Sequence, residues 1–166
     1  GEFDGDALAT PSSGPELCLM PGGRGRLLAI PADGGPRELP AIDALFPVLH
    51  GLAGEDGSVQ DLAEVARVPL VGCGILGPAA ALDKDIAKRL LAQAGIPNAR
   101  SLTIHPDAAL SFAEIEAALG LPVFVKPARQ GSSVGVSKAA SQAQYEAALA
   151  QGFGHDRKLI VEEFVA

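Results

Sequence analysis

A single lysine at the end of an apolar strand, followed by a loop of small polar residues, is the feature of this sequence with the clearest chemistry. Residues 123–136, Val-Phe-Val-Lys-Pro-Ala-Arg-Gln-Gly-Ser-Ser-Val-Gly-Val, place Lys126 at the exit of the predicted strand and Gly131, Ser132 and Ser133 in the loop after it. Glycine lets backbone N–H groups approach an anion, serine adds a hydroxyl donor, and lysine supplies a positive charge. The combination predicts a phosphate-binding loop, although glycine–serine turns without a ligand are also common.

A second glycine-rich segment, Gly72–Gly77, matches the pattern G-x-G-x-x-G between a predicted strand and a predicted helix. A dinucleotide-binding domain uses such a turn together with an acidic residue about 20 residues later, which contacts the ribose. No acidic residue ends a following strand here. We therefore favour a tight strand-to-helix turn and keep a Rossmann-type nucleotide-binding module as the alternative. The P-loop pattern G-x-x-x-x-G-K-[ST] is absent from the sequence.

Two lysines one helical turn apart, Lys84 and Lys88, share a helix face. Lys84 also lies early in the predicted helix, where the helix dipole favours anions. From the residues alone, a solvated face with an ordinary Asp85–Arg89 ion pair is the simpler interpretation.

A polar loop that holds His50 and Glu55 directly follows a predicted buried strand. Open α/β sheets place ligands at this carboxyl edge, so His50 is a candidate substrate contact, although a loop histidine is more often only a polar contact. His105 and His155 lie in predicted loops without partners. Neither cysteine, Cys18 or Cys73, has a histidine near it in the sequence, so no nucleophile–base pair can be assembled.

The elements that hold these residues alternate between helix and strand, which predicts an α/β fold with a parallel sheet in its first part. We predict a hairpin of 17–20 with 27–30, then a buried strand over 45–49, a helix over 58–66 and a buried strand over 68–71. A boundary near Gly77 separates this part from a helix–strand–helix–strand–strand–helix–strand region.

That second region is predicted in more detail. One helix begins at Pro78, carries Leu82, Ile86 and Leu90 on one face, and ends at Gly95. The other elements are strands over 102–104, 121–125, 134–137 and 158–165, and two helices opened by the capping boxes Ser111/Glu114 and Ser141/Gln144. Tyr145 is expected to pack against the sheet.

Composition limits the class of partner. The chain has 166 residues, a net charge of −7, 48 % apolar and 20 % charged residues, which is typical of a globular protein that does not bind nucleic acid or a membrane surface. Two cysteines indicate reduced thiols rather than a disulfide framework. The chain starts without methionine and stops after a strand-like run, so we expect it to be a piece of a longer protein.

Four segments in this order resemble the D-alanine–D-alanine ligase family of ATP-grasp enzymes. They are residues 46–58 (Phe-Pro-Val-Leu-His-Gly-Leu-Ala-Gly-Glu-Asp-Gly-Ser), 71–74 (Val-Gly-Cys-Gly), 82–89 (Leu-Asp-Lys-Asp-Ile-Ala-Lys-Arg) and 123–138, which is the lysine–glycine–serine region with Ser137 and Lys138. The resemblance implies a partial N-terminal α/β substrate domain (1–77), the small α+β subdomain of an ATP-grasp fold (78–160) and the start of a C-terminal ATP-grasp domain (161–166). The rest of that domain is expected to be missing.

The resemblance also implies ATP-dependent joining of two D-alanines, through an acyl phosphate, for peptidoglycan synthesis in the cytoplasm by a homodimer. Lys84 and Lys126 would contact ATP phosphates, and His50 and Glu55 would face the first D-alanine. Gly131, Ser132, Ser133 and Val134 would cover the nucleotide, with Ser132 also directed to the substrate. The adenine and ribose would contact a hinge segment, partly through its backbone atoms. This segment consists of Glu162, Glu163, Phe164 and Val165.

Two parts of the family pattern are not found: the N-terminal strand whose glutamate holds the substrate ammonium, and the C-terminal domain whose carboxylates bind Mg²⁺. We assign no metal ligand to these residues and expect the 166-residue stretch alone to be inactive. D-alanine–D-lactate ligation is the nearest alternative activity, because the second substrate is chosen by C-terminal residues. A purely structural fragment is a third hypothesis.

Overall fold

The computed structural model describes residues 14–165, which divide into two units. One unit contains residues up to 46 together with 61–71, and the other contains 47–60 together with the chain from 72 onward. Residues 1–13 and 166, the ends of the predicted domains, lie outside the described part. In residues 14–165 no helix is both long enough and apolar enough to cross a bilayer.

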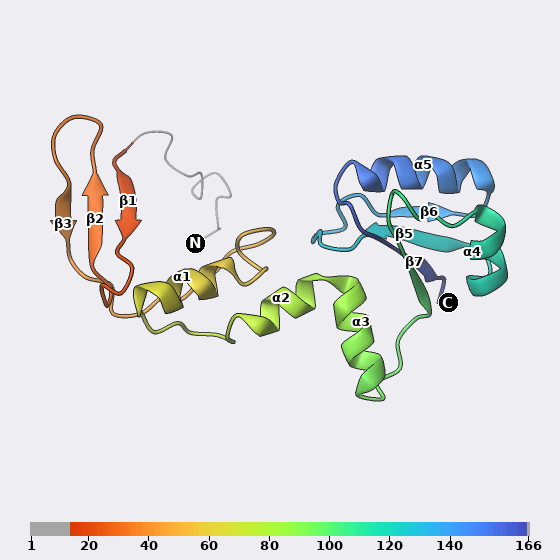
Figure 1. The fold of residues 1–166 in the computed structure, drawn as a ribbon, viewed down its shortest axis with the longest axis horizontal. Coiled ribbons are helices and arrows are strands. Elements are labelled where there is room, and N and C mark those ends of the chain that lie inside the picture. Colours follow the sequence, from red (N-terminus) through yellow and green to blue (C-terminus); the bar gives the residue numbers. More distant parts are fainter. Residues whose placement is uncertain (1–13, 166) are drawn as a thin grey trace, which may run out of the picture. The chain divides into compact units, whose positions relative to one another are not determined.

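The first unit contains an antiparallel sheet in the order β1-β2-β3 (Figure 1). Its strands are β1 (Glu16–Leu19), β2 (Leu27–Ile30) and β3 (Arg37–Leu39). The predicted hairpin is confirmed, with Glu16 opposite Ile30, whereas β3 was not predicted. The turn between β1 and β2 donates to the last turn of α1 (Ser58–Ala66), from Gly22 N to the Val65 carbonyl at 2.7 Å.

The buried strands predicted over 45–49 and 68–71 are wrong in length. The expected parallel pairing is present only as a single bridge, between Leu45 and Leu70. Phe46 and Val48 are 73 % and 74 % exposed, and Pro47 between them has no N–H to donate to a ladder. An apolar run therefore did not make a strand here, and His50 follows a loop rather than a buried strand.

The second unit contains an antiparallel sheet in the order β4-β7-β5-β6, with α4 and α5 beside it (Figure 1). The elements are β4 (Ser101–Ile104), α4 (Phe112–Leu119), β5 (Val123–Pro127), β6 (Ser137–Ala139), α5 (Gln142–Phe153) and β7 (Leu159–Glu163). Alternate residues of β5 are buried: Val123 and Val125 join a core with Ile115 and Tyr145, as predicted for Tyr145. The other face of β5 carries Lys126.

Local signals predicted most elements of this sheet and its helices. Ser111 and Glu114 form the complete capping box of α4, as predicted. Ser141 accepts from Gln144 N, but the Gln144 side chain accepts from Ala140 N at 2.8 Å, so the second box is incomplete. The strand predicted over 134–137 begins only at Ser137, since the turn of the preceding loop continues through residue 136.

The helix predicted from Pro78 to about residue 94 is two helices. They are α2 (Leu76–Leu82) and α3 (Lys84–Gln93), separated by Asp83 in an extended conformation with φ −78° and ψ 100°. The Asp83 carboxylate accepts from Ile86 N at 3.3 Å, which makes it the N-cap of α3. Ile86 and Leu90 are exposed, so the predicted apolar stripe is not buried.

Candidate functional site

A cleft of about 610 Å³ lies within the second unit, and six of the residues selected from the sequence line it. These are Glu55, Lys84, Lys126, Gly131, Ser132 and Ser133. Phe124, Gln130 and Val136 also line the cleft and were not predicted. Six of the selected residues do not line it: His50, Val134, Glu162, Glu163, Phe164 and Val165.

The loop after β5 owes its shape to left-handed backbone. Ser132 and Ser133 have φ of +48° and +59°, which is uncommon for residues with a side chain. These two serines are the central residues of a turn closed by Val134 N and the Gly131 carbonyl at 3.0 Å, and a second turn is closed by Val136 N and the Ser133 carbonyl at 3.3 Å. Successive N–H groups in such a conformation form a concavity suited to an anion.

Gly135 is the position in this loop that requires glycine. Its φ is +69°, and a Cβ there would lie 2.8 Å from both Pro127 Cγ and His155 Cδ2. His155, which the sequence left without a partner, therefore packs against the loop. Its backbone carbonyl also accepts from the Gln130 side chain at 3.3 Å.

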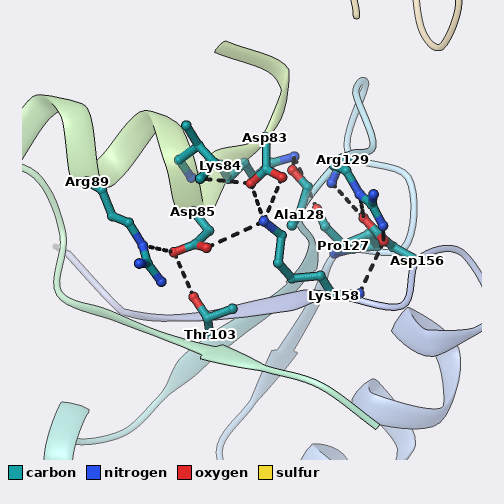
Figure 2. Close-up of polar contacts among 11 residues, drawn as sticks. Asp83, Lys84, Asp85, Arg89, Thr103, Pro127, Ala128, Arg129, Asp156 and Lys158 are labelled. Atoms are coloured by element: carbon teal, nitrogen blue, oxygen red, sulfur yellow. Dashed lines mark hydrogen bonds and ion pairs between the residues drawn. The ribbon is translucent and has the colours of Figure 1, made fainter. Parts of the chain in front are cut away.

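Lys84, the first residue of α3, contacts the beginning of the same loop. Its ammonium donates to the carbonyls of Pro127 at 3.2 Å and Gln130 at 2.5 Å. Figure 2 shows it beside Pro127 and Ala128. Burial, and secondarily the like charge of Lys126, lower the pKa of Lys84. Two ammonium groups from different elements thus face one cleft.

Lys126 forms an ion pair with Glu162, and Lys88 holds the other oxygen of that carboxylate at 3.1 Å. Burial opposes ionisation of Glu162, but these two lysines lower its pKa nonetheless. The Lys88 side chain is only 14 % exposed, so the predicted solvated face of Lys84 and Lys88 is wrong. The i, i+4 spacing was visible in the sequence, whereas the distant partner Glu162 was not. The expected Asp85–Arg89 pair is confirmed at 2.8 Å.

The two glutamates at the end of β7 point to opposite sides, as successive strand residues do. Glu163 accepts from the backbone N and the Nε of Arg100, at 2.7 and 2.6 Å. The Glu163 carboxylate therefore pairs with Arg100 and not with the lysines that hold Glu162. Phe164 stacks beside Phe124 with ring centroids 6.2 Å apart, and Val165 is exposed.

Glu55 and His50 lie in the loop 50–57. The Glu55 carboxylate accepts from Gly51 N at 2.6 Å, and its Oε1 is 3.8 Å from His50 Nδ1. A Cβ on Gly131 would lie 3.5 Å from Glu55 Oε2, so Glu55 lies close to the glycine–serine loop. The His50 side chain is 88 % exposed.

The glycine pattern Gly72–Gly77 does not form a dinucleotide-binding turn in the described residues. Only a single bridge at Leu70 precedes it, and α2 begins at Leu76, inside the pattern. This agrees with the preference for a turn over a Rossmann-type module.

Two family models match most of the chain. "D-ala D-ala ligase N-terminus" matches residues 25–73 and "D-ala D-ala ligase C-terminus" matches residues 90–166. The chain belongs to the D-alanine–D-alanine ligase family. The resemblance found in the four sequence segments is thereby confirmed.

Curated relatives carry the same family name. The chain is 60 % identical, over 98 % of its length, to D-alanine–D-alanine ligase A of Brucella suis, and 53 % identical, also over 98 %, to that of Mesorhizobium japonicum. It covers 46 % and 45 % of those two proteins, so it spans slightly less than half the length of these relatives.

Solved structures confirm the predicted α/β fold of ATP-grasp ligases. A D-alanyl-alanine synthetase A from Vibrio cholerae matches 92 % of this chain and 45 % of its own, with a TM-score of 0.79 and 31 % identity. The VanG D-Ala:D-Ser ligase from Enterococcus faecalis matches 90 % of this chain and 42 % of its own, with a TM-score of 0.76 and 39 % identity.

Proposed function

We propose that the protein containing this chain joins two D-alanines to D-alanyl-D-alanine at the expense of ATP, as a step of peptidoglycan precursor synthesis. One observation carries the proposal: Lys84 from α3 lines one cleft together with Lys126 and the glycine–serine loop, which belong to a distant segment of the sequence. The high identity to proteins named D-alanine–D-alanine ligase A supports the substrate.

The cleft residues suit phosphate binding. Two ammonium groups and a concave row of backbone N–H groups can neutralise the charge that builds up around a transferred phosphoryl group. We assign Lys84 and Lys126 to the phosphates and Gly131–Val134 to the cover over the nucleotide. Glu162–Val165 are assigned to the adenine and ribose, through backbone atoms in the case of Glu163.

We assign Glu55, Ser132 and His50 to the side of the first D-alanine. Glu55 and Ser132 line the cleft, and Glu55 is close to Gly131, which supports this assignment. In the proposed reaction the carboxylate of the first D-alanine attacks the γ-phosphorus of ATP, forming an acyl phosphate and ADP. The amine of the second D-alanine then attacks the acyl carbon, forms the amide bond and releases phosphate.

ATP-dependent ligases of this kind use Mg²⁺, which would neutralise negative charge on the phosphates. Within residues 14–165 no group of three or more His, Cys, Asp or Glu side chains is arranged to hold a metal ion. The described residues therefore do not fit a magnesium site, and we assign the metal ligands to the remainder of the protein.

The test uses the full-length protein with ATP, Mg²⁺ and D-alanine. We expect one ADP for each D-alanyl-D-alanine formed, with the product identified by mass spectrometry. ADP formation that does not depend on D-alanine would contradict the proposal, as would tight binding of NAD without binding of ATP.

The second substrate needs its own experiment, because one of the similar structures is a D-Ala:D-Ser ligase. D-Alanine, D-serine and D-lactate should compete in one reaction, across a range of pH. We expect the dipeptide D-alanyl-D-alanine as the main product. Depsipeptide as the main product at neutral pH would establish D-alanine–D-lactate ligation instead.

We further propose a cytoplasmic homodimer, on the family resemblance alone. Light scattering coupled to size-exclusion chromatography of the full-length protein measures the molar mass, and a monomer would contradict the proposal. Fractionation of the source cells tests the location.

A further inference from the structure

Lys158 is a largely buried lysine with two acidic partners, and it does not line the cleft described above. Its ammonium lies 2.6 Å from Asp83 Oδ2 and 3.4 Å from Asp85 Oδ2 (Figure 2). All three side chains are at most 15 % exposed. Burial of a charged group costs free energy unless the group has a partner, so these three charged side chains differ from ordinary surface charges that serve solubility.

Both carboxylates belong to the beginning of α3. Asp83 is the N-cap that accepts from Ile86 N, and Asp85 lies in the first turn. Asp85 also accepts from Arg89 Nε at 2.8 Å and from Thr103 Oγ1 at 2.9 Å. Lys158 directly precedes β7. Its side chain therefore attaches the N-terminus of α3 to the beginning of β7.

Backbone hydrogen bonds join a third segment to this contact. Lys84 N donates to the Ala128 carbonyl, and Ala128 N donates to the Lys158 carbonyl, both at 2.9 Å. The beginning of α3, the end of β5 and the beginning of β7 thus meet at one place. These elements carry Lys84, Lys126 and Glu162; the two lysines line the cleft, and Glu162 pairs with Lys126.

The arrangement opposes an unfavourable interaction. Lys84 and Lys126 both carry a positive charge and line the same cleft, and burial together with the repulsion between these like charges lowers the pKa of Lys84. The positive end of the α3 dipole adds to this repulsion. The two acidic residues at the start of α3, held by Lys158, counter it.

From these contacts we propose that Lys158 is a positioning residue for ATP binding: by holding Asp83 and Asp85 it fixes Lys84 over the loop that follows β5. The proposal rests on the proposed function, because it assumes that Lys84 contacts the phosphates. Lys158 itself contacts no cleft residue through its side chain among the contacts of the described chain.

The experiment compares Lys158→Met and Lys158→Arg with the wild type in the full-length protein. The measurements are the dissociation constant of ATP, the KM values for ATP and D-alanine, and the melting temperature. We expect about tenfold weaker ATP binding in Lys158→Met, since a small displacement of a binding group is costly. Lys158→Arg keeps the charge and should restore binding to near the wild-type value, and the KM for D-alanine should not change.

Ser111→Ala is the matched control, because it removes the N-cap of α4, a helix that contributes no residue to the cleft. It should lower the melting temperature and leave the dissociation constant of ATP unchanged. A purely structural role of Lys158 would give this same result in Lys158→Met, and that result would overturn the inference.

If Lys158→Met does not fold, Asp83→Asn decides. An asparagine can still cap α3, but it lacks the charge that faces Lys158. Weaker ATP binding in this variant supports the inference, and wild-type binding overturns it. A wild-type protein that binds no ATP would instead refute the proposed function, so the two failures are distinguishable.

Discussion

The lysines around the cleft each contact a partner from a distant part of the second unit. Lys84 donates to the carbonyls that begin the glycine–serine loop, whereas Lys126 and Lys88 share the carboxylate of Glu162. Lys126 lies on β5, lines the cleft and pairs with Glu162 of β7. Substituting one lysine at a time tests the role of each lysine separately.

Lys126→Ala should lower kcat/KM for ATP by roughly 100-fold, since it removes a positive charge that we assign to the ATP phosphates. Steady-state kinetics of the full-length protein measure this. Arg37→Ala is the control: it removes a positive charge from an exposed position on β3 and should leave the kinetics unchanged. Unchanged kinetics in Lys126→Ala would remove Lys126 from the site.

Asp156 gives a prediction for stability against pH. Its carboxylate is only 3 % exposed and accepts from Arg129 N and Nη2 at 2.8 and 2.5 Å. Burial opposes its ionisation, but the hydrogen bonds and charge of Arg129 lower its pKa in the folded protein. A lowered pKa contributes stability above the unfolded-state pKa, and this contribution is lost as the pH falls through the folded-state value.

Asp156→Asn should therefore lower the free energy of unfolding by about 2 kcal/mol at pH 7, with the difference from wild type shrinking under acid. Urea unfolding at a series of pH values between neutral and strongly acidic measures it. A difference that stays constant with pH would contradict the assigned ion pair.

At the scale of elements, the sequence predicted those features of the fold that depend on residues close together in the chain. The β1–β2 hairpin, the capping box of α4 and the exit of Lys126 from β5 are each encoded within a few residues. The break at Asp83 was missed because the sequence spacing of apolar residues continues through it. The position of Lys88 was missed because its partner Glu162 is distant in sequence. The apolar run at 45–49 shows that a hydrophobic pattern does not make a strand without a partner along its length.

Gly135→Ala should damage the loop as an element. A Cβ at this position clashes with Pro127 and His155, and its left-handed backbone disfavours alanine by about 1 kcal/mol. We expect a lower melting temperature and weaker ATP binding in the full-length protein. Gly74→Ala is the control, because a Cβ there meets nothing within 4 Å. Equal behaviour of the two variants would show that the loop tolerates a side chain.

At the scale of the whole molecule, the chain spans slightly less than half of its curated relatives. Its second unit holds the lysines and the loop that we propose for phosphate binding, and its described residues do not supply a group of acidic or histidine ligands for a metal. Phosphoryl transfer needs both phosphate binding and metal binding, and we thus assign these two roles to different parts of the protein.

A protein limited to residues 1–166 should therefore show no ATP- and D-alanine-dependent phosphate release under conditions in which the full-length protein turns over. Phosphate release is measured at equal molar concentration, with circular dichroism to verify that the shorter protein is folded. Turnover by the folded 166-residue protein would contradict this division of roles.

The lowered pKa of Lys84 has a consequence for chemical labelling. At mildly alkaline pH a larger fraction of its amine is uncharged, and therefore nucleophilic, than for a lysine of ordinary pKa. We expect a dilute acylating reagent to modify Lys84 before the exposed Lys138, as peptide mass spectrometry can measure, and ATP to slow this modification. Lys84 would then serve as a covalent reporter of nucleotide occupancy, usable with any substrate and without turnover.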